Sequence, residues 1–205
     1  MAFKLQNTDF VVNTSIILTQ SNLEEKMAQY KSMASNVEVN GQTVLSVIDA
    51  MSIKRRGLQI LAENGINDPK PDQWYKQQNW LDAFRTIGDE IGPSVLYSIG
   101  RAIPENAQFP PQIDNIEKAL SAIDVAYHMN HRGGEIGTYG YEKIGDKQIK
   151  MVCKNPYPCD FDRGIIESMA KKFKPQSSAI VRVKHDDSAP CRKSGGDSCT
   201  YHITW

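Results

Sequence analysis

Residues 179–185 read Ala179-Ile180-Val181-Arg182-Val183-Lys184-His185, so apolar and polar side chains alternate along this stretch. Such alternation is typical of a β-strand with one buried face. Weaker patterns of the same kind predict strands over residues 135–144, 148–153 and 199–205, and an apolar face at helical spacing predicts a helix from about Cys159 to Phe173. We therefore expect an antiparallel ββαββ unit over about residues 133–205.

The part of the chain before this unit has helical patterns. Ser21 and Glu24 form a capping box, which predicts a helix through about Ser35. Further helices are expected from Thr43, from a cap at Asp72, from Ser94 to a loop at Pro104, and over about residues 113–131. The expected architecture is an α+β fold in one domain, 1–205, with N-terminal helices over about 1–132 followed by the antiparallel ββαββ sheet unit.

Composition limits the classes of function. The 205 residues include 24 Lys+Arg and 24 Asp+Glu, so the formal net charge is zero. This balance gives no electrostatic reason to expect a nucleic-acid or anionic-membrane partner. The chain has no apolar run of the ~18 residues that a membrane span needs, and no secretory leader pattern. We expect a cytoplasmic protein with no nucleic-acid and no membrane partner.

All four cysteines lie in the last third of the chain, at positions 153, 159, 191 and 199. The direction of the chain through a ββαββ unit would bring them to one edge of the sheet, together with His128, His131 and His185. Three interpretations stay open on the residues alone: buried packing, a zinc site, or a reactive thiol at Cys159. The histidines could equally be helix-capping or core residues.

Aromatic residues form a second group of candidates. Trp74, Trp80 and Phe84 fall within one expected helix, and Tyr127 lies on the apolar face of the long helix. They could pack a core or a dimer interface, or they could line a pocket for an aromatic ligand. No phosphate-binding loop, dinucleotide fingerprint, nucleophile elbow or zinc-protease helix is present in the sequence.

Two C-terminal runs carry a resemblance to a known family. Pro158-Cys159-Asp160, followed by a helix, a strand and Cys191-Arg192-x-x-Gly195-Gly196-Asp197-x-Cys199-x-Tyr201, resembles the 4-vinyl reductase domain. That family shares a superfamily with haem nitric-oxide-binding sensors and with vesicle-trafficking complex subunits. The specific part of the resemblance covers residues 155–205, and the rest is similar in the order of elements only.

The resemblance implies a small-molecule-binding or sensor domain, commonly dimeric, with a structural zinc near an aromatic pocket. The implied zinc ligands are Cys159, Asp160, Cys191 and Cys199. Cys153 or His185 stays open as a replacement for Asp160. The Tyr-x-Ser-x-Arg signature of the haem branch is absent, since the nearest run is Tyr139-Gly140-Tyr141-Glu142-Lys143, so haem is not expected.

Our leading hypothesis is therefore a stand-alone sensor domain without catalysis of its own. It would hold a structural zinc, bind a hydrophobic or aromatic small molecule at Trp74, Trp80, Phe84 and Tyr127, form a homodimer and signal to a protein partner. One alternative is a metal- or His-dependent enzyme that uses His185 or His128 with Asp186 and Asp187. Another is an assembly subunit that binds no ligand and exposes a large apolar patch.

Overall fold

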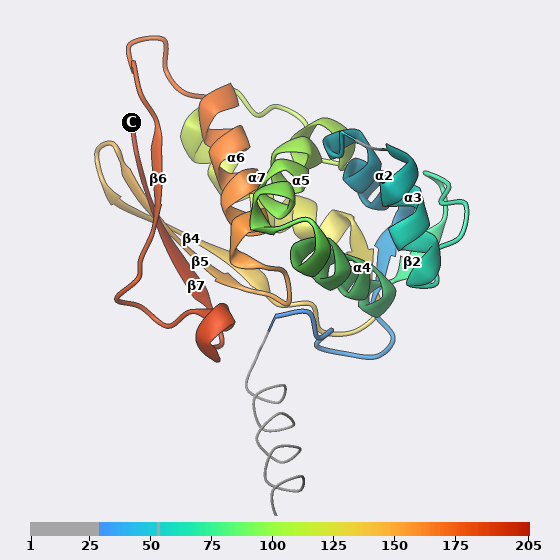
Figure 1. Ribbon diagram of the computed structural model, residues 1–205. Coiled ribbons are helices and arrows are strands. Elements are labelled where there is room, and N and C mark those ends of the chain that lie inside the picture. Colours follow the sequence, from blue (N-terminus) through green and yellow to red (C-terminus); the bar gives the residue numbers. More distant parts are fainter. Residues whose placement is uncertain (1–28, 53) are drawn as a thin grey trace, which may run out of the picture.

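The computed structural model describes residues 29–52 and 54–205. Figure 1 shows a strongly twisted antiparallel sheet with helices packed against one of its faces. Two helices, α6 and α7, lie next to the sheet, and the remaining helices form further layers behind them. This mixture of helices and an antiparallel sheet is the expected α+β fold class.

The large sheet has the strand order β4-β5-β7-β6, and each neighbouring pair is antiparallel. The ββαββ prediction is confirmed, although β6 starts three residues later than the alternating pattern of residues 179–185 indicated. Cys153 lies directly opposite Cys199, and His185 lies opposite Tyr201. The strands are β4 (Thr138–Gly145), β5 (Gln148–Lys154), β6 (Arg182–His185) and β7 (Cys199–Thr204).

Six α-helices occupy the part of the chain that the structure describes. They are α2 (Gly41–Ala50), α3 (Lys54–Glu63), α4 (Gln77–Glu90), α5 (Pro93–Asn106), α6 (Ile116–Met129) and α7 (Cys159–Lys172). The cap side chains are Asn40 for α2 and Asn115 for α6, each of which accepts a hydrogen bond from a backbone N–H of the first turn.

Three sequence predictions for the helical part need correction. The start of the helix expected at Ser21 lies outside the described residues, and residues 29–35 form turns and loop rather than helix. Helix α5 continues through Pro104, which lies in its last turn, and ends two residues later at Asn106. Helix α6 ends at Met129, two residues earlier than expected.

A small second sheet was not predicted. Strands β1 (Glu38–Asn40), β2 (Trp74–Lys76) and β3 (His131–Arg132) pair in the antiparallel order β2-β1-β3. Trp74 therefore lies in a strand and not in the expected helix, which starts at Gln77. The strand forms because β1, far away in the sequence, satisfies its backbone groups, and no local pattern encodes that pairing.

Helices α5 and α7 cross at unusually close range because a glycine from each lies at the contact. A Cβ atom on Gly100 would lie 2.1 Å from the carbonyl oxygen of Phe161, and one on Gly164 would lie 2.3 Å from that of Tyr97. Any side chain at either position would separate the helices. The crossing fixes α7, whose first residue is Cys159, against the helical layers.

Buried apolar side chains from Val37 to Ile203 form one connected core cluster between the sheet and the helices. Among the described residues, no helix is long and apolar enough to cross a membrane.

Candidate metal centre and adjoining cavity

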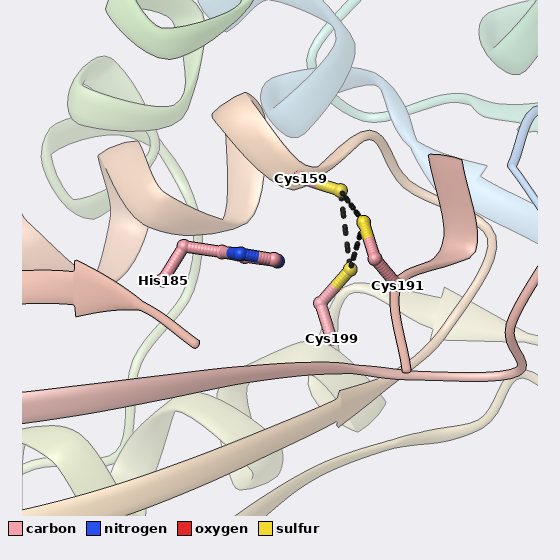
Figure 2. A group of neighbouring side chains, drawn as sticks. All are labelled: Cys159, His185, Cys191 and Cys199. Atoms are coloured by element: carbon pink, nitrogen blue, oxygen red, sulfur yellow. Dashed lines mark hydrogen bonds between the residues drawn. The ribbon is translucent and has the colours of Figure 1, made fainter. Parts of the chain in front are cut away.

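Three thiols and one imidazole meet at one end of the large sheet (Figure 2). The sulfur atoms of Cys159, Cys191 and Cys199 and a ring nitrogen of His185 all lie within 4.8 Å of one another. The sulfur–sulfur distances are 3.1 Å for Cys159–Cys199, 3.5 Å for Cys159–Cys191 and 3.7 Å for Cys191–Cys199. Among residues 29–52 and 54–205, this is the one such group of potential metal ligands.

Each ligand residue comes from a different element. Cys159 is the first residue of α7, His185 ends β6 and Cys199 begins β7. Cys191 precedes the short 3-10 helix η1 (Arg192–Ser194), and its carbonyl oxygen accepts hydrogen bonds from the N–H groups of Ser194 and Gly196. Gly195 permits this tight turn because its φ of 85° is in the left-handed region.

His185 is oriented by a carboxylate. Its Nδ1 atom lies 2.9 Å from Oδ1 of Asp187, and its ring packs edge-on against Tyr201 at 5.2 Å between centroids. Its Nε2 atom is buried and has no hydrogen-bond partner among the described residues. Because buried polar atoms are nearly always paired, an unpaired imidazole nitrogen facing three thiols indicates a missing partner.

The three sulfurs differ in their electrostatic environment. Cys159 donates a hydrogen bond to Cys199, which lowers the pKa of the Cys199 thiol to about 4; the nearby guanidinium of Arg192 acts in the same direction. The same hydrogen bond raises the pKa of Cys159. Gln29 also donates to the sulfur of Cys159, at 2.9 Å. A lowered pKa at Cys199 favours its thiolate, which is the form that binds metals.

The donor set and its dimensions fit zinc. A tetrahedral zinc with bonds of about 2.3 Å to sulfur has sulfur–sulfur edges of about 3.8 Å. Two of the three observed distances, 3.5 and 3.7 Å, are close to that edge, and the third is shorter at 3.1 Å. Three cysteines and one histidine are an established ligand set for structural zinc.

The family resemblance implied Asp160 as a ligand and left Cys153 or His185 open in its place; Asp160 is not a member of this group, whereas His185 is. Its carboxylate pairs with Arg163 on the next turn of α7, at 3.4 Å. Adjacent residues on a helix point about 100° apart, so the side chain of Asp160 points in a different direction from that of Cys159. Cys153 is fully buried opposite Cys199 and also lies outside the group.

A cavity lies among helices α2, α4, α5, α6 and α7, with Tyr139 of β4 at its wall. It has a volume of about 40 Å³ and is lined almost entirely by apolar atoms. Of the predicted ligand-binding residues, Trp80 and Tyr127 line it. Phe84 is not a lining residue but packs on Trp80, with ring centroids 4.6 Å apart. Trp74 lies elsewhere, with the guanidinium of Arg132 4.5 Å from its ring centroid.

Polar groups at the cavity wall are mostly paired with one another. His131 contacts the carbonyl oxygen of Tyr127 through Nδ1, which must therefore carry the proton, so its Nε2 accepts from the hydroxyl of Tyr157 at 2.6 Å. Burial lowers the pKa of His131 to about 4, so the ring is neutral. The exception is Nε1 of Trp80, which is buried with no partner in the part of the chain that the structure describes.

A buried ion pair lies between the cavity and the cysteines. Arg192 and Asp162 are both completely buried and form a salt bridge. Burial raises the pKa of Asp162 to about 6, while the guanidinium of Arg192 opposes that shift, so the carboxylate is ionised at neutral pH. The hydroxyl of Tyr139, a cavity-lining residue, donates to Asp162 at 2.5 Å. No pattern in the sequence indicates this pair, because Asp and Arg are usually exposed and nothing marks these two residues as buried.

The solved structures to which this chain is similar include H-NOX proteins. The chain is similar to an H-NOX protein from S. oneidensis (14% identity, TM-score 0.59, covering 80% of this chain and 95% of that one). It is also similar to those from K. algicida (14%, 0.57, 80% and 95%) and T. tengcongensis (16%, 0.56, 80% and 93%). No family model matches the chain, and no curated protein matches it significantly.

At these identities the likeness establishes the fold, which is the H-NOX-like α+β fold. It agrees with the fold that the resemblance of the C-terminal motif implied, and it does not test the 4-vinyl reductase family itself.

Proposed function

We propose that this chain is a small-molecule-binding sensor domain whose structure is completed by a zinc ion bound to Cys159, His185, Cys191 and Cys199. The observation that carries the zinc proposal is the unpaired Nε2 atom of His185, which faces the three sulfurs. A metal is the partner that satisfies this nitrogen and the thiols at once.

The role of the zinc would be structural. Four protein ligands complete a tetrahedron and leave no position for a reactive water. The ion would tie the start of α7, the end of β6, the loop before η1 and the start of β7 to one point. The loop over residues 186–198 has little secondary structure of its own, so metal binding would offset the entropy of ordering it.

The cavity supports a small, uncharged and mainly apolar ligand. No charged side chain lines it, His131 is neutral, and the wall contains Trp80, Tyr127, Tyr157 and Phe161. The N–H group of Trp80 is the donor still available for a polar atom of the ligand. A small uncharged molecule of a few atoms, with an apolar body and one acceptor atom, matches these properties.

The residues of the cavity do not fit a haem. Two of the similar solved structures are of heme proteins, and one of them belongs to the H-NOX family. Here a volume of about 40 Å³ has room for only a few atoms, and both ring nitrogens of His131, the histidine that lines the cavity, are engaged in hydrogen bonds. We therefore keep the expectation of a haem-free protein as part of the proposal.

Two further parts of the proposal concern partners. We propose a homodimer that passes its ligand state to another protein, because sensor domains without their own catalysis need an acceptor. The enzyme alternative is less well supported, since His185 is directed toward three thiols and Asp187 holds its other nitrogen. The ligand-free assembly alternative is less well supported because the core contains a cavity.

The metal is tested by elemental analysis of purified protein together with a visible spectrum. The proposal predicts about one zinc per chain and no Soret band. Replacing zinc by cobalt should give the intense thiolate-to-cobalt charge-transfer absorption of a tetrahedral sulfur-rich site. A chain without metal, or one with a Soret band, would contradict the proposal.

The cavity is tested by melting curves with xenon and with acetone as probes, because each is small enough for a cavity of about 40 Å³. Both should raise the melting temperature of the wild-type chain, since a ligand that binds the native state stabilises it. Ala126→Leu, which fills the cavity, should abolish this shift. Val125→Leu is the matched control, because Val125 directly precedes Ala126 in α6 and is exposed. No shift for the wild type, or equal shifts in both variants, would count against ligand binding in this cavity.

A further inference from the structure

The cysteine–histidine group and the cavity are joined by a continuous chain of buried polar contacts. Nε of Arg192 lies 3.5 Å from the sulfur of Cys199. The same guanidinium forms the salt bridge to Asp162, and Asp162 accepts a hydrogen bond from Tyr139. Tyr139 lines the cavity. Three contacts thus lead from a metal ligand to the wall of the ligand pocket.

The guanidinium of Arg192 is held on all its sides. Its Nη1 atom donates to both the carbonyl and the side-chain oxygen of Asn155, its Nη2 atom contacts Asp162, and its Nε atom contacts Cys199. A fully buried ion pair contributes little net stability, since desolvation cancels most of the attraction. Stability therefore does not explain why charged residues occupy these two buried positions. A role in connecting the zinc site with the cavity would explain it.

Metal binding changes the charge that Arg192 faces. Three thiolates, a neutral imidazole and Zn²⁺ together carry one negative charge. Arg192 would then be shared between this negative centre and the carboxylate of Asp162. The salt bridge to Asp162 and the contact with Cys199 use the same guanidinium, so a stronger attraction to one of them weakens the attraction to the other. Asp162 also accepts a hydrogen bond from Tyr139. The strength of that hydrogen bond therefore depends on how strongly Arg192 interacts with the same carboxylate.

We propose that Arg192, Asp162 and Tyr139 couple the zinc site to the cavity, so that metal occupancy adjusts the cavity wall and cavity occupancy adjusts the zinc affinity. This inference rests on the zinc site proposed above and concerns its regulation. The reciprocity follows from linkage, because a coupling free energy between two binding sites acts equally in both directions.

Helix α7 offers a different route between the sites, since it carries both Cys159 and the cavity residues Phe161 and Ile165. A purely mechanical signal through this helix would not need the hydroxyl of Tyr139. Removing that one oxygen therefore separates the two routes.

Trp80 provides the readout, because it lines the cavity and lies outside the polar chain. The chain contains three tryptophans, and Trp74→Phe with Trp205→Phe leaves Trp80 as the sole emitter. Metal-free protein of this background is titrated with ZnCl₂ while fluorescence is followed. Bound zinc is measured separately by elemental analysis. The emission of Trp80 should change in proportion to bound zinc and saturate at about one equivalent.

The decisive comparison is between Tyr139→Phe and Tyr141→Phe. Both tyrosines belong to β4, but Tyr141 is only partly buried and takes no part in the polar chain. Tyr139→Phe should still bind about one zinc while losing more than about half of the fluorescence amplitude, and Tyr141→Phe should keep all of it. If Tyr139→Phe does not fold at the assay temperature, Arg192→Lys takes its place, because lysine keeps the charge but cannot bridge both partners.

The outcomes separate the two proposals. Equal amplitudes in Tyr139→Phe and Tyr141→Phe, or zinc binding without any response of Trp80, would overturn the coupling and leave the zinc site intact. Absence of bound zinc in the background protein would overturn the zinc site, and the coupling with it.

Discussion

Nδ1 of His185 lies 2.9 Å from a carboxylate oxygen of Asp187, and this contact leaves Nε2 of the same ring facing three cysteine sulfurs. A carboxylate behind a histidine fixes its tautomer and its direction, and such partners are a regular part of zinc sites. The arrangement explains how a residue at the end of an exposed strand can be a defined ligand. It also identifies the residues whose replacement tests the site.

Asp187→Ala should weaken zinc binding by at least about tenfold, because the ring of His185 loses the partner that orients it. The affinity is measured by competition with a coloured zinc chelator. Asp197→Ala is the control, since Asp197 belongs to the same loop but pairs with Lys154. Equal affinities for the two variants would mean that Asp187 does not position a ligand.

His185→Ala and Asp160→Asn distinguish the two candidate ligand sets. The position of His185 in the group predicts that His185→Ala reduces the zinc content well below one per chain, whereas Asp160→Asn leaves it unchanged because that carboxylate pairs with Arg163. Elemental analysis after dialysis gives the answer. Loss of zinc in Asp160→Asn alone would restore the ligand set that the sequence resemblance implied.

Cys191→Ser should lower both the zinc content and the free energy of unfolding, since the loop before β7 loses the metal that orders it. Cys153→Ala provides the comparison within the same sheet. Cys153 is buried but lies outside the group, so this variant should keep its zinc and lose about 1 kcal/mol from packing. The measurements are metal analysis and chemical denaturation. A Cys191→Ser protein as stable and as zinc-rich as the wild type would exclude a structural metal here.

Acid should destabilise the protein partly through His131. Burial lowers the pKa of this ring to about 4 in the folded chain, below the ordinary value of 6.5. As the pH falls below about 6.5 the unfolded chain takes up the proton first, so the free energy of unfolding decreases by as much as about 3 kcal/mol down to pH 4.

His131→Gln removes this titration and should make the stability less dependent on pH in that window. His128→Gln is the control, because His128 lies three residues earlier, in the last turn of α6, and is exposed. Denaturation at pH 7, 5.5 and 4.5 gives the comparison. Parallel pH profiles for the wild type and His131→Gln would show that the buried ring does not contribute.

The close crossing of α5 and α7 predicts a strong effect of a single methyl group. Gly164→Ala places a Cβ about 2.3 Å from the carbonyl oxygen of Tyr97, so the helices must separate, at a cost of about 1–3 kcal/mol. Gly88→Ala in α4 is the matched control, since its Cβ would lie 3.2 Å from the flexible end of Leu96. Thermal unfolding of both variants should show the larger loss at Gly164. Similar melting temperatures would mean that the crossing adjusts freely.

The sequence predicts well those helices and strands whose apolar residues recur at a regular spacing within the element itself. The strands of the large sheet and helix α7 appear in the sequence as periods of 2 and 3.6, and the structure has them within a few residues. Trp74 was placed in a helix because it precedes a helical pattern. Only its pairing with Asn40, 34 positions earlier in the chain, makes it a strand residue.

Part of the candidate site could also be predicted from the sequence, because it follows from the order of the strands and of helix α7. The direction of the chain brings Cys159, Cys191, Cys199 and His185 to one edge of the sheet, and the structure places them there. The same reasoning included His128 and His131, which lie outside the group: His128 is exposed, and His131 faces the cavity. The buried pair of Asp162 and Arg192 had no sequence signal, because charged residues are normally solvated.

X-ray absorption at the zinc edge of the purified protein tests the central claim most directly, because it reports the atoms around the metal. A site formed by Cys159, His185, Cys191 and Cys199 predicts three sulfurs at about 2.3 Å and one nitrogen at about 2.0 Å. A first shell of oxygen and nitrogen only, or protein that carries no zinc, would contradict it.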